Sequence, residues 1–391
     1  MRLLILLVST STFFNLYQLQ AIYPWLSIRY GAGLTEAGWL NMATLLGMMI
    51  TAPLASKITR KILPQHAIIA GVLTLALLNI IIAISKELDF LFIVRFLQGV
   101  TLPCILTSGI QILSKIEDIN SRKKCIGYYV AGTIFGSTLS RFYPAISIDL
   151  LGWQIGFISC AGFLLLACYF IAQRAQSVNI KSIEKEQKKA PYISYLKVAF
   201  LEKRLLIAYF LGFGLLLTQS SIFTVLGLSL AEFPYNKSSS QIGLIYLASL
   251  PAIVVTLLIP KLFRLKSEKF FYVTFISLLW ASLSLMGSNF NFIIIGVIGF
   301  SIGTYSMQIM TTEMVSRAQK VPANFASGIY LFFYYGGGTI GAFFSAFSYN
   351  HWGWLGALIF VAIFQTVILV IVIFLVIDSR KEARQNVKYI E

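Results

Sequence analysis

Two arginines, Arg95 and Arg141, lie inside long apolar stretches of the chain. A guanidinium is always charged and costly to bury, so a residue of this kind is retained to bind an anion or another polar group. Each lies six positions from one end of its stretch, which places both about 9 Å below the same rim. We therefore predict a cationic site that contains both residues. The alternative is that each guanidinium reaches the polar rim or pairs with Asp89, Asp149 or Glu36.

Carboxylates that could exchange protons are absent from the middle of every apolar stretch. A buried carboxylate is the usual device for this chemistry, because burial raises its pKa towards neutrality. Glu36, at the end of a stretch, is the nearest carboxylate and is therefore the candidate for proton coupling, together with Arg95. The alternative is that Glu36 is only a charge at a helix end. Neither His66 nor His351 is at mid-stretch, and no spacing of residues predicts a metal site.

Uncharged polar and aromatic side chains near the middle of apolar stretches form a third set of candidates. Besides the two arginines, the candidate binding residues are Asn15, Gln18, Gln219, Tyr305, Gln308 and Tyr334. Asparagine and glutamine at such positions either contact a ligand or form hydrogen bonds between helices. Both interpretations stay open. Gln18 and Gln219 lie 201 positions apart, a spacing that recurs elsewhere in the chain.

The stretches that hold these residues dominate a chain of 391 residues, of which 58% are hydrophobic and 12% are charged. A soluble domain carries about 25% charged residues. Each stretch is long enough to cross a hydrocarbon core of about 30 Å, where lipid permits only helices. The sequence therefore predicts an all-α membrane protein with twelve transmembrane helices. The predicted spans are 3–27, 36–55, 66–84, 89–113, 125–147, 155–173, 205–231, 240–260, 268–287, 290–312, 323–347 and 355–377.

Lysine and arginine side chains determine the predicted orientation. Most of the 31 lie on connections and tails that share one side of the membrane. Because cytoplasmic loops are enriched in these residues, both termini are predicted to be cytoplasmic. The net charge of +16 then reflects topology and not a nucleic-acid partner. The polar segment 174–204 is predicted to be a cytoplasmic linker with a short surface helix, between six-helix bundles at 1–173 and 205–391.

An internal repeat supports this division into two pseudo-symmetric bundles. Gly127, Tyr129, Gly136, Gly152 and Trp153 recur 201 positions later as Gly328, Tyr330, Gly337, Gly353 and Trp354. Two parallel halves with a binding site between them at the midplane form a known transporter plan. Glycines spaced along two of the spans are predicted to allow close helix packing, either as static contacts or as a flexing seam between the halves. These glycines are Gly132, Gly136, Gly337 and Gly341.

Several motifs resemble the major facilitator superfamily, and within it the twelve-helix bacterial drug and metabolite efflux transporters. Arg95-Phe-Leu-Gln98-Gly99 is similar to the Arg-x-x-Gln-Gly motif of this group. The basic loop motif is similar to Lys57-Ile-Thr59-Arg60-Lys61, although Ser56 and Thr59 replace its usual aspartate and glycine. The antiporter pattern falls on Gly132 and Gly136, but Ser137, Ser140 and Arg141 stand in place of its proline and last two glycines. Tyr17-x-x-Gln20, Tyr23-Pro24 and Tyr334-Tyr335-Gly336 resemble segments of the exporters.

The resemblance implies a monomeric transporter of the bacterial inner membrane that moves a small organic molecule by alternating access. It implies efflux driven by the proton gradient, with no cofactor. Two arginines without a mid-span carboxylate favour an anionic or neutral amphiphile as the substrate. One alternative is uptake of a metabolite or a siderophore-like carboxylate by a symporter or facilitator with the same fold. A membrane enzyme or a non-transporting receptor is least favoured, because the sequence contains no histidine–carboxylate cluster and no nucleotide-binding loop.

Overall fold

The computed structural model describes residues 1–59, 62–114, 116, 118–176, 192–262, 268–287, 289–316, 320–321 and 323–388. These residues form helices and turns, and none of them lies in a strand. Arg60 and Lys61 of the predicted basic motif lie outside the described residues, as do 177–191 of the predicted linker. The end of that linker forms a short helix, α8 (Tyr192–Leu201), which agrees with the prediction of a helix in this segment.

The helices of the first part of the chain are α1 (Arg2–Phe13), α2 (Tyr23–Tyr30), α3 (Leu34–Thr51), α4 (Ala55–Thr59), α5 (Pro64–Ile84), α6 (Leu88–Ser114) and α7 (Ile119–Gln176). After α8 follow α9 (Lys203–Ala231), α10 (Ser239–Tyr246), the 3₁₀-helix η1 (Leu247–Ser249), α11 (Pro251–Leu262), α12 (Glu268–Met286), α13 (Phe290–Ser316) and α14 (Ala323–Lys388). Every predicted span overlaps between one and three of these helices. Among the described residues, seven helical segments are long and apolar enough to cross a membrane. The all-helical membrane fold is thus confirmed.

Two of these segments, 124–175 in α7 and 325–374 in α14, are about twice as long as one crossing requires. Each contains one glycine with a positive φ angle, 77° at Gly152 and 63° at Gly353. Side chains rarely adopt this left-handed backbone conformation, and glycine adopts it readily. The two glycines therefore bend α7 and α14 into pairs of crossings at equivalent positions of the sequence repeat.

The tryptophan after each glycine joins the bend to a neighbouring helix. Trp153 donates its indole N–H to the carbonyl of Ile82 at 3.0 Å, and Trp354 donates to the carbonyl of Met286 at 2.8 Å. Both acceptors lie in the last turn of a helix, α5 or α12, where carbonyls lack partners within the helix. The Gly-Trp pairs are therefore the same structural device used twice.

Two predicted spans are irregular. The expectation of a continuous helix over 3–27 is wrong, whereas the span 240–260 is confirmed as a helical segment and contains a short 3₁₀ turn. In the first, α1 ends at Phe13 and α2 begins at Tyr23, with turns between them. In the second, η1 separates α10 from α11, which begins at Pro251, a residue with no N–H to continue the hydrogen-bond ladder. Irregular backbone within a membrane is tolerated where protein groups satisfy it, and the first interruption is entirely buried.

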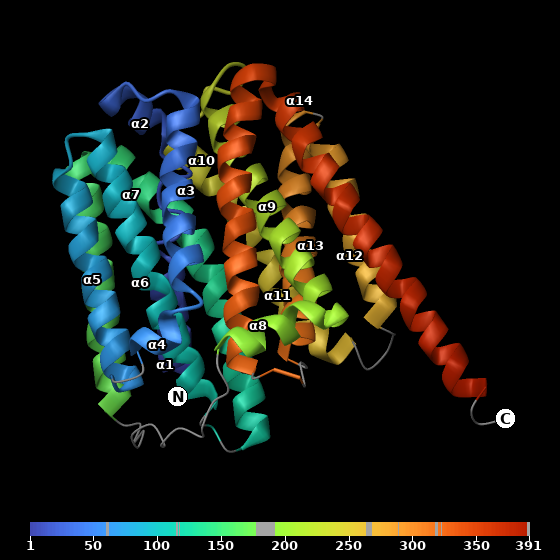
Figure 1. Ribbon diagram of the computed structural model, residues 1–391. Coiled ribbons are helices and arrows are strands. Elements are labelled where there is room, and N and C mark those ends of the chain that lie inside the picture. The colour runs from blue at the N-terminus through green and yellow to red at the C-terminus, as the bar shows by residue number, and fades with distance from the viewer. Residues whose placement is uncertain are drawn as a thin grey trace.

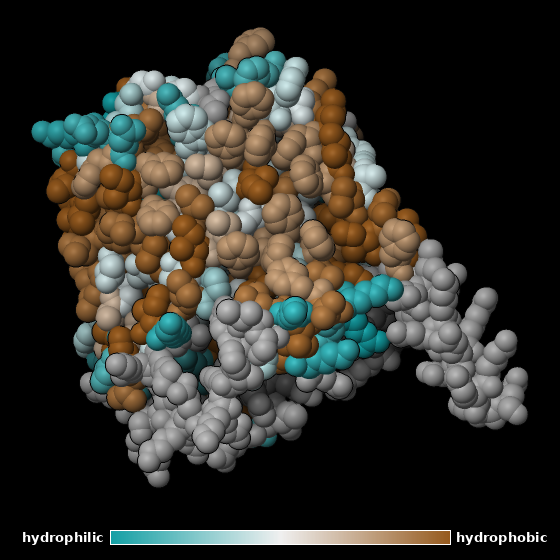
Figure 2. Space-filling view, in the orientation of Figure 1, coloured by the Kyte–Doolittle hydropathy of each residue, from teal (hydrophilic) through white to brown (hydrophobic). Residues whose placement is uncertain are grey.

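We use N-terminal half for residues 1–176 and C-terminal half for residues 192–388. Both termini lie at one end of the molecule, the terminal face, and α2 and the loop after α9 lie at the opposite end, the distal face (Figure 1). The halves meet mainly where α3 packs on α14 and where α7 packs on α10 and α11. Figure 2 shows a broad apolar band between these ends, with hydrophilic side chains along both of its edges.

Small residues bring the halves together near the distal face at two equivalent places. A Cβ atom added to Gly38 would lie 2.6 Å from the Cβ of Ala346, and one added to Gly243 would lie 3.0 Å from the Cβ of Ala145. Ala145 and Ala346 are 201 positions apart. We call these two contacts the distal seam. Because ordinary Cβ contacts are longer than about 3.4 Å, the distal seam is closed tightly.

The four glycines that were predicted to allow close helix packing make their contacts elsewhere, and their role as a flexing seam between the halves stays a prediction. Gly136 packs against the backbone of Thr10 in α1, and Gly132 packs against Ser9 of the same helix. Gly337 and Gly341 pack against the carbonyls of Phe213 and Leu217 in α9. All four contacts are made inside one half, because each glycine faces the first helix of its own half. These contacts pack α7 against α1 and α14 against α9.

Candidate functional site

Arg95 is fully buried in α6 and binds the interrupted backbone between α1 and α2. Its Nη1 donates to the carbonyl of Asn15 and its Nη2 donates to the carbonyl of Leu16, both at 2.8 Å. Nη1 also donates to Oε1 of Gln98 at 2.5 Å. The guanidinium thus satisfies carbonyls that the end of α1 leaves without helical partners. All of these acceptors are neutral and belong to the N-terminal half.

Arg141, in α7, is also buried, with 1% of its surface exposed. Its Nε donates to Oε1 of Gln20 at 2.6 Å, and its Nη1 donates to the carbonyl of Ser137 at 2.8 Å. Both acceptors are neutral, and the buried Nη2 has no hydrogen-bond partner among the described residues. A buried donor without a partner is costly, and more so when it is charged. Arg141 therefore retains the capacity to bind an anionic or strongly polar group.

Three aromatic rings surround the guanidinium of Arg141. Its central carbon lies 3.9 Å from the ring centroid of Tyr17, 4.6 Å from that of Phe223 and 5.3 Å from that of Tyr246. Tyr17 belongs to the N-terminal half, whereas Phe223 in α9 and Tyr246 in α10 belong to the C-terminal half. The negative ring faces stabilise the cation. The cation of one half is therefore held by rings of the other.

Polar side chains continue the contact between the halves around Arg141. Oγ1 of Thr224 in α9 accepts hydrogen bonds at 3.4 Å from both Nε2 of Gln20 and Nδ2 of Asn41. The hydroxyls of Ser137 and Tyr305 are 3.1 Å apart and join α7 to α13. The predicted residue Tyr305 thus lies one hydrogen bond from the residue whose carbonyl binds Arg141.

Asn15 and Gln18 have a different environment from the one predicted for ligand-binding residues. Nδ2 of Asn79, in α5, donates to Oδ1 of Asn15 at 2.8 Å, and Nε2 of Gln18 donates to Oδ1 of Asn79 at 3.0 Å. The three amides form one buried network inside the N-terminal half. For these two residues the alternative of hydrogen bonding between helices describes the structure.

The remaining predicted binding residues are spread along the centre of the C-terminal half. Gln219 is buried in α9, whereas Gln308 in α13 is half-buried. Tyr334 stacks on Tyr330 with centroids 5.7 Å apart and meets the ring of Tyr335 at 74°. Tyr305 is linked to the surroundings of Arg141 through Ser137.

The acidic residues bind backbone amides at helix ends. Oε2 of Glu36 accepts the N–H of Gly33 at 2.6 Å at the start of α3, and Oδ2 of Asp149 accepts the N–H of Ser240 at 2.7 Å at the start of α10. A carboxylate is stabilised there by the helix dipole. The second contact crosses between the halves, so Asp149 belongs to the distal closure and does not neutralise Arg141.

The other motif residues lie on or near the α3–α6 contact. Lys57 is exposed on α4, and Gln98 is buried beside Arg95. A Cβ on Gly99 would collide with the carbonyl of Thr44, so glycine is required for α6 to approach α3 this closely.

Sequence reasoning missed Phe223, Tyr246 and Asn41, because an aromatic ring or an amide near a span end carries no signal of what it faces. It also missed Gln365, which is fully buried in α14 with both amide atoms unpaired. Among the described residues, no three histidine, cysteine, aspartate or glutamate side chains are grouped as a metal site.

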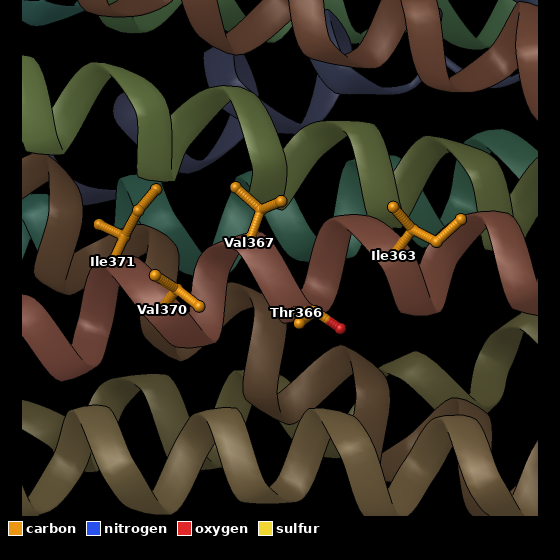
Figure 3. Close-up of a pocket in the computed structure, with 5 residues that line it drawn as sticks. All are labelled: Ile363, Thr366, Val367, Val370 and Ile371. Atoms are coloured by element: carbon orange, nitrogen blue, oxygen red, sulfur yellow. The ribbon is translucent and has the colours of Figure 1, made fainter.

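A separate hollow on α14 does not have the chemistry of a polar binding site. Figure 3 shows that its lining comes from one helix, with Ile363, Val367 and Ile371 along it. The hollow has a volume of about 400 Å³, and its single polar side chain, Thr366, donates to the carbonyl of Ala362. It carries no group that could recognise a charged ligand.

Comparison with known proteins links this arrangement to one family. The family model described as Major Facilitator Superfamily matches residues 5–342. An uncharacterized transporter of Buchnera aphidicola subsp. Schizaphis graminum is 28% identical over 384 residues, covering 95% of this chain and 88% of the relative. The inner membrane transport protein YnfM of Escherichia coli is 24% identical, with coverage of 61% and 57%. The quinolone resistance protein NorB of Staphylococcus aureus is 26% identical, with coverage of 51% and 43%.

Proposed function

Because the chain belongs to the Major Facilitator Superfamily, we propose that it is a secondary transporter that exports a small anionic or neutral amphiphile. The substrate passes between two six-helix bundles, 1–173 and 205–391, which alternately open to each side of the bacterial inner membrane. The protein acts as a monomer in the lipid bilayer, with both termini in the cytoplasm and without a nucleic-acid partner. The proton gradient supplies the energy, and no cofactor takes part.

The observation that carries this proposal is the buried guanidinium of Arg141 at the contact between the halves. Its Nη2 is unpaired, and its two hydrogen-bonded partners are neutral. A carboxylate or sulfonate could accept from Nη2 and balance the charge, which would form a strong charge-assisted hydrogen bond. An organic cation would be repelled. The phenol rings of Tyr17, Tyr305 and Tyr334 provide an aromatic surface for the rest of an amphiphilic ligand.

Export is supported by the relative named a quinolone resistance protein, since removing a drug from the cell is one way to resist it. Glu36 is the proposed proton site, because it lies two residues before Gly38 of the distal seam, and Arg95 is the second residue proposed for proton coupling. The second candidate function is uptake by a symporter or facilitator. It is favoured by Ser137, Ser140 and Arg141, which replace the proline and glycines of the antiporter pattern.

The test is transport by the purified protein in liposomes, with the membrane potential clamped and a pH gradient imposed. The probes are 2-naphthalenesulfonate, its neutral sulfonamide and the cation 1-methylquinolinium. Proton-coupled export predicts that the sulfonate accumulates in vesicles with an acidic lumen, because protons leave as substrate enters. Accumulation in an alkaline lumen would indicate symport, and equilibration without accumulation would indicate a facilitator.

The role of Arg141 is tested with Arg141→Gln, whose amide can still bond to Gln20. Loss of one charge-assisted hydrogen bond should raise the Kd of the sulfonate about 10-fold or more. The matched control is Arg29→Gln, since Arg29 also contacts aromatic rings but lies on α2 near the distal edge. If both variants bind the sulfonate as well as the unmodified protein does, the anion site is not at Arg141.

A further inference from the structure

We propose that Arg141, Phe223 and Tyr246 form a latch that keeps the distal seam closed until an anionic group engages Arg141. The charge of the ligand, and not its size or apolar surface, would then determine whether the distal side opens. This inference rests on the proposed function, because it gives the binding of substrate at Arg141 a consequence for the position of the two halves.

The latch is built so that its parts cannot shift independently. The hydroxyl of Tyr246 donates to the carbonyl of Phe223 at 2.7 Å, and the two rings meet at 61° with centroids 5.7 Å apart. Phe223 in turn meets Phe300 of α13 nearly edge-on, at 82°. Both rings are fully buried. The C-terminal half therefore presents them to the guanidinium as one rigid unit.

The distal seam places this unit against Arg141. Gly243 lies one helical turn before Tyr246, and a Cβ on Gly243 would be 3.3 Å from the carbonyl oxygen of Arg141. The absence of a side chain at Gly243 thus lets α10 approach α7 closely enough for the ring of Tyr246 to reach the guanidinium. The seam and the latch close together, and separation of α10 from α7 must break both.

An anion and the two rings compete for the same cation. A charge-assisted hydrogen bond to Nη2 is stronger than a contact between a cation and a ring. Arg141 is already tied to its own half through Gln20 and Ser137. An anion bound to it in the N-terminal half neutralises the charge that attracts Phe223 and Tyr246. A neutral ligand leaves this attraction intact, so the seam stays closed.

The experiment measures the distal opening directly by pulsed electron paramagnetic resonance. Spin labels are attached at Leu150→Cys and Phe233→Cys, which are 76% and 86% exposed and lie on different halves. The native cysteines are replaced by alanine in this protein. Without ligand, the double variant Phe223→Leu/Tyr246→Leu should raise the ratio of long to short distances about tenfold. Phe275→Leu, which removes a buried ring of α12 that stacks on Phe271 and not on the latch, should leave the ratio unchanged.

Ligand dependence is measured on the same labelled pair. The expected result is that 2-naphthalenesulfonate lengthens the distance in the otherwise unmodified protein and its neutral sulfonamide does not. Tyr246→Phe, which keeps the ring and loses the hydrogen bond to Phe223, should open the seam less than the double variant does. The latch is overturned if Phe275→Leu opens the seam as much as the double variant does, or if sulfonate and sulfonamide have equal effects. A seam that opens as expected in a protein that moves no probe across liposomes would refute the transport function and leave the latch intact.

Discussion

Trp153 and Trp354 donate equivalent indole hydrogen bonds in the two halves, one to Ile82 and the other to Met286. The sequence repeat is therefore a repeat of contacts as well as of residues. In each half the indole hydrogen bond joins the bend between two crossings to the end of a neighbouring helix, α5 in one half and α12 in the other. Without this hydrogen bond, rotation about the backbone of the one left-handed glycine could change the angle of the bend.

Removing this bond should destabilise the fold. Trp354→Phe keeps an aromatic ring but leaves the carbonyl of Met286 without its donor, at a cost of about 1–2 kcal/mol. We expect a lower Tm for the detergent-solubilised protein at a fixed scan rate. Trp352→Phe, at a position 66% exposed to the surroundings, is the control. Equal losses in the two variants would mean that the indole bond contributes nothing specific.

Closure of the distal side should depend on Gly38 and not on Gly328, which lies near the terminal face. A Cβ at Gly38 would lie 2.6 Å from Ala346, whereas one at Gly328 would lie 3.5 Å from Pro53, an ordinary contact. Gly38→Ala should therefore force the distal seam apart and Gly328→Ala should not. Overpacking by about 1–3 kcal/mol would favour opening about tenfold.

The readout is the reaction of a membrane-impermeant maleimide with Ser220→Cys, a buried position facing Asn41 across the halves. The native cysteines are replaced by alanine, and reagent is added on the distal side. Labelling should be about tenfold faster in Gly38→Ala. Faster labelling in Gly328→Ala instead would place the tight closure at the other end of the molecule.

Arg95 should be required for stability before it is required for transport. Arg95→Met removes the donors to Asn15, Leu16 and Gln98 and leaves two buried carbonyls unpaired. We expect a loss of about 3 kcal/mol or more in the free energy of unfolding. Arg95→Lys should restore part of it, because an ammonium can still donate to these carbonyls. A stable Arg95→Met protein with impaired transport would instead assign Arg95 to the coupling chemistry.

Glu36→Gln separates the helix-end role of Glu36 from its proposed role in proton coupling. The amide oxygen can still accept the N–H of Gly33, so stability should change little. If Glu36 is the proton site, accumulation driven by the pH gradient disappears, and exchange of preloaded 2-naphthalenesulfonate across the membrane continues. Unchanged accumulation would show that the proton is carried elsewhere.

The sequence predicted the helices and the repeat because both depend on local composition. Apolar length identifies a crossing, and the Gly152-Trp153 pair has its counterpart 201 positions later at Gly353-Trp354. It did not predict the interruption after Phe13, because that break is stabilised by Arg95, eighty positions from Asn15. A local pattern does not contain a contact of this kind.

The site was predicted in part. Arg141 stood out because a charge in an apolar stretch is costly, and Tyr305 bonds to Ser137, whose carbonyl accepts from Arg141. Asn15 and Gln18 belong instead to the network around Asn79, since an amide in the middle of a helix looks the same whether it faces a ligand or another amide. Phe223 and Tyr246 become recognisable only when both halves are seen together.

The position equivalent to Arg141 in the second half is Ala342, 201 residues later. The duplicated fold therefore has a buried arginine at this position in the N-terminal half and none at the equivalent position in the C-terminal half. A solute with an acidic head and an apolar tail could occupy such a passage in a single orientation, with the head towards the first half.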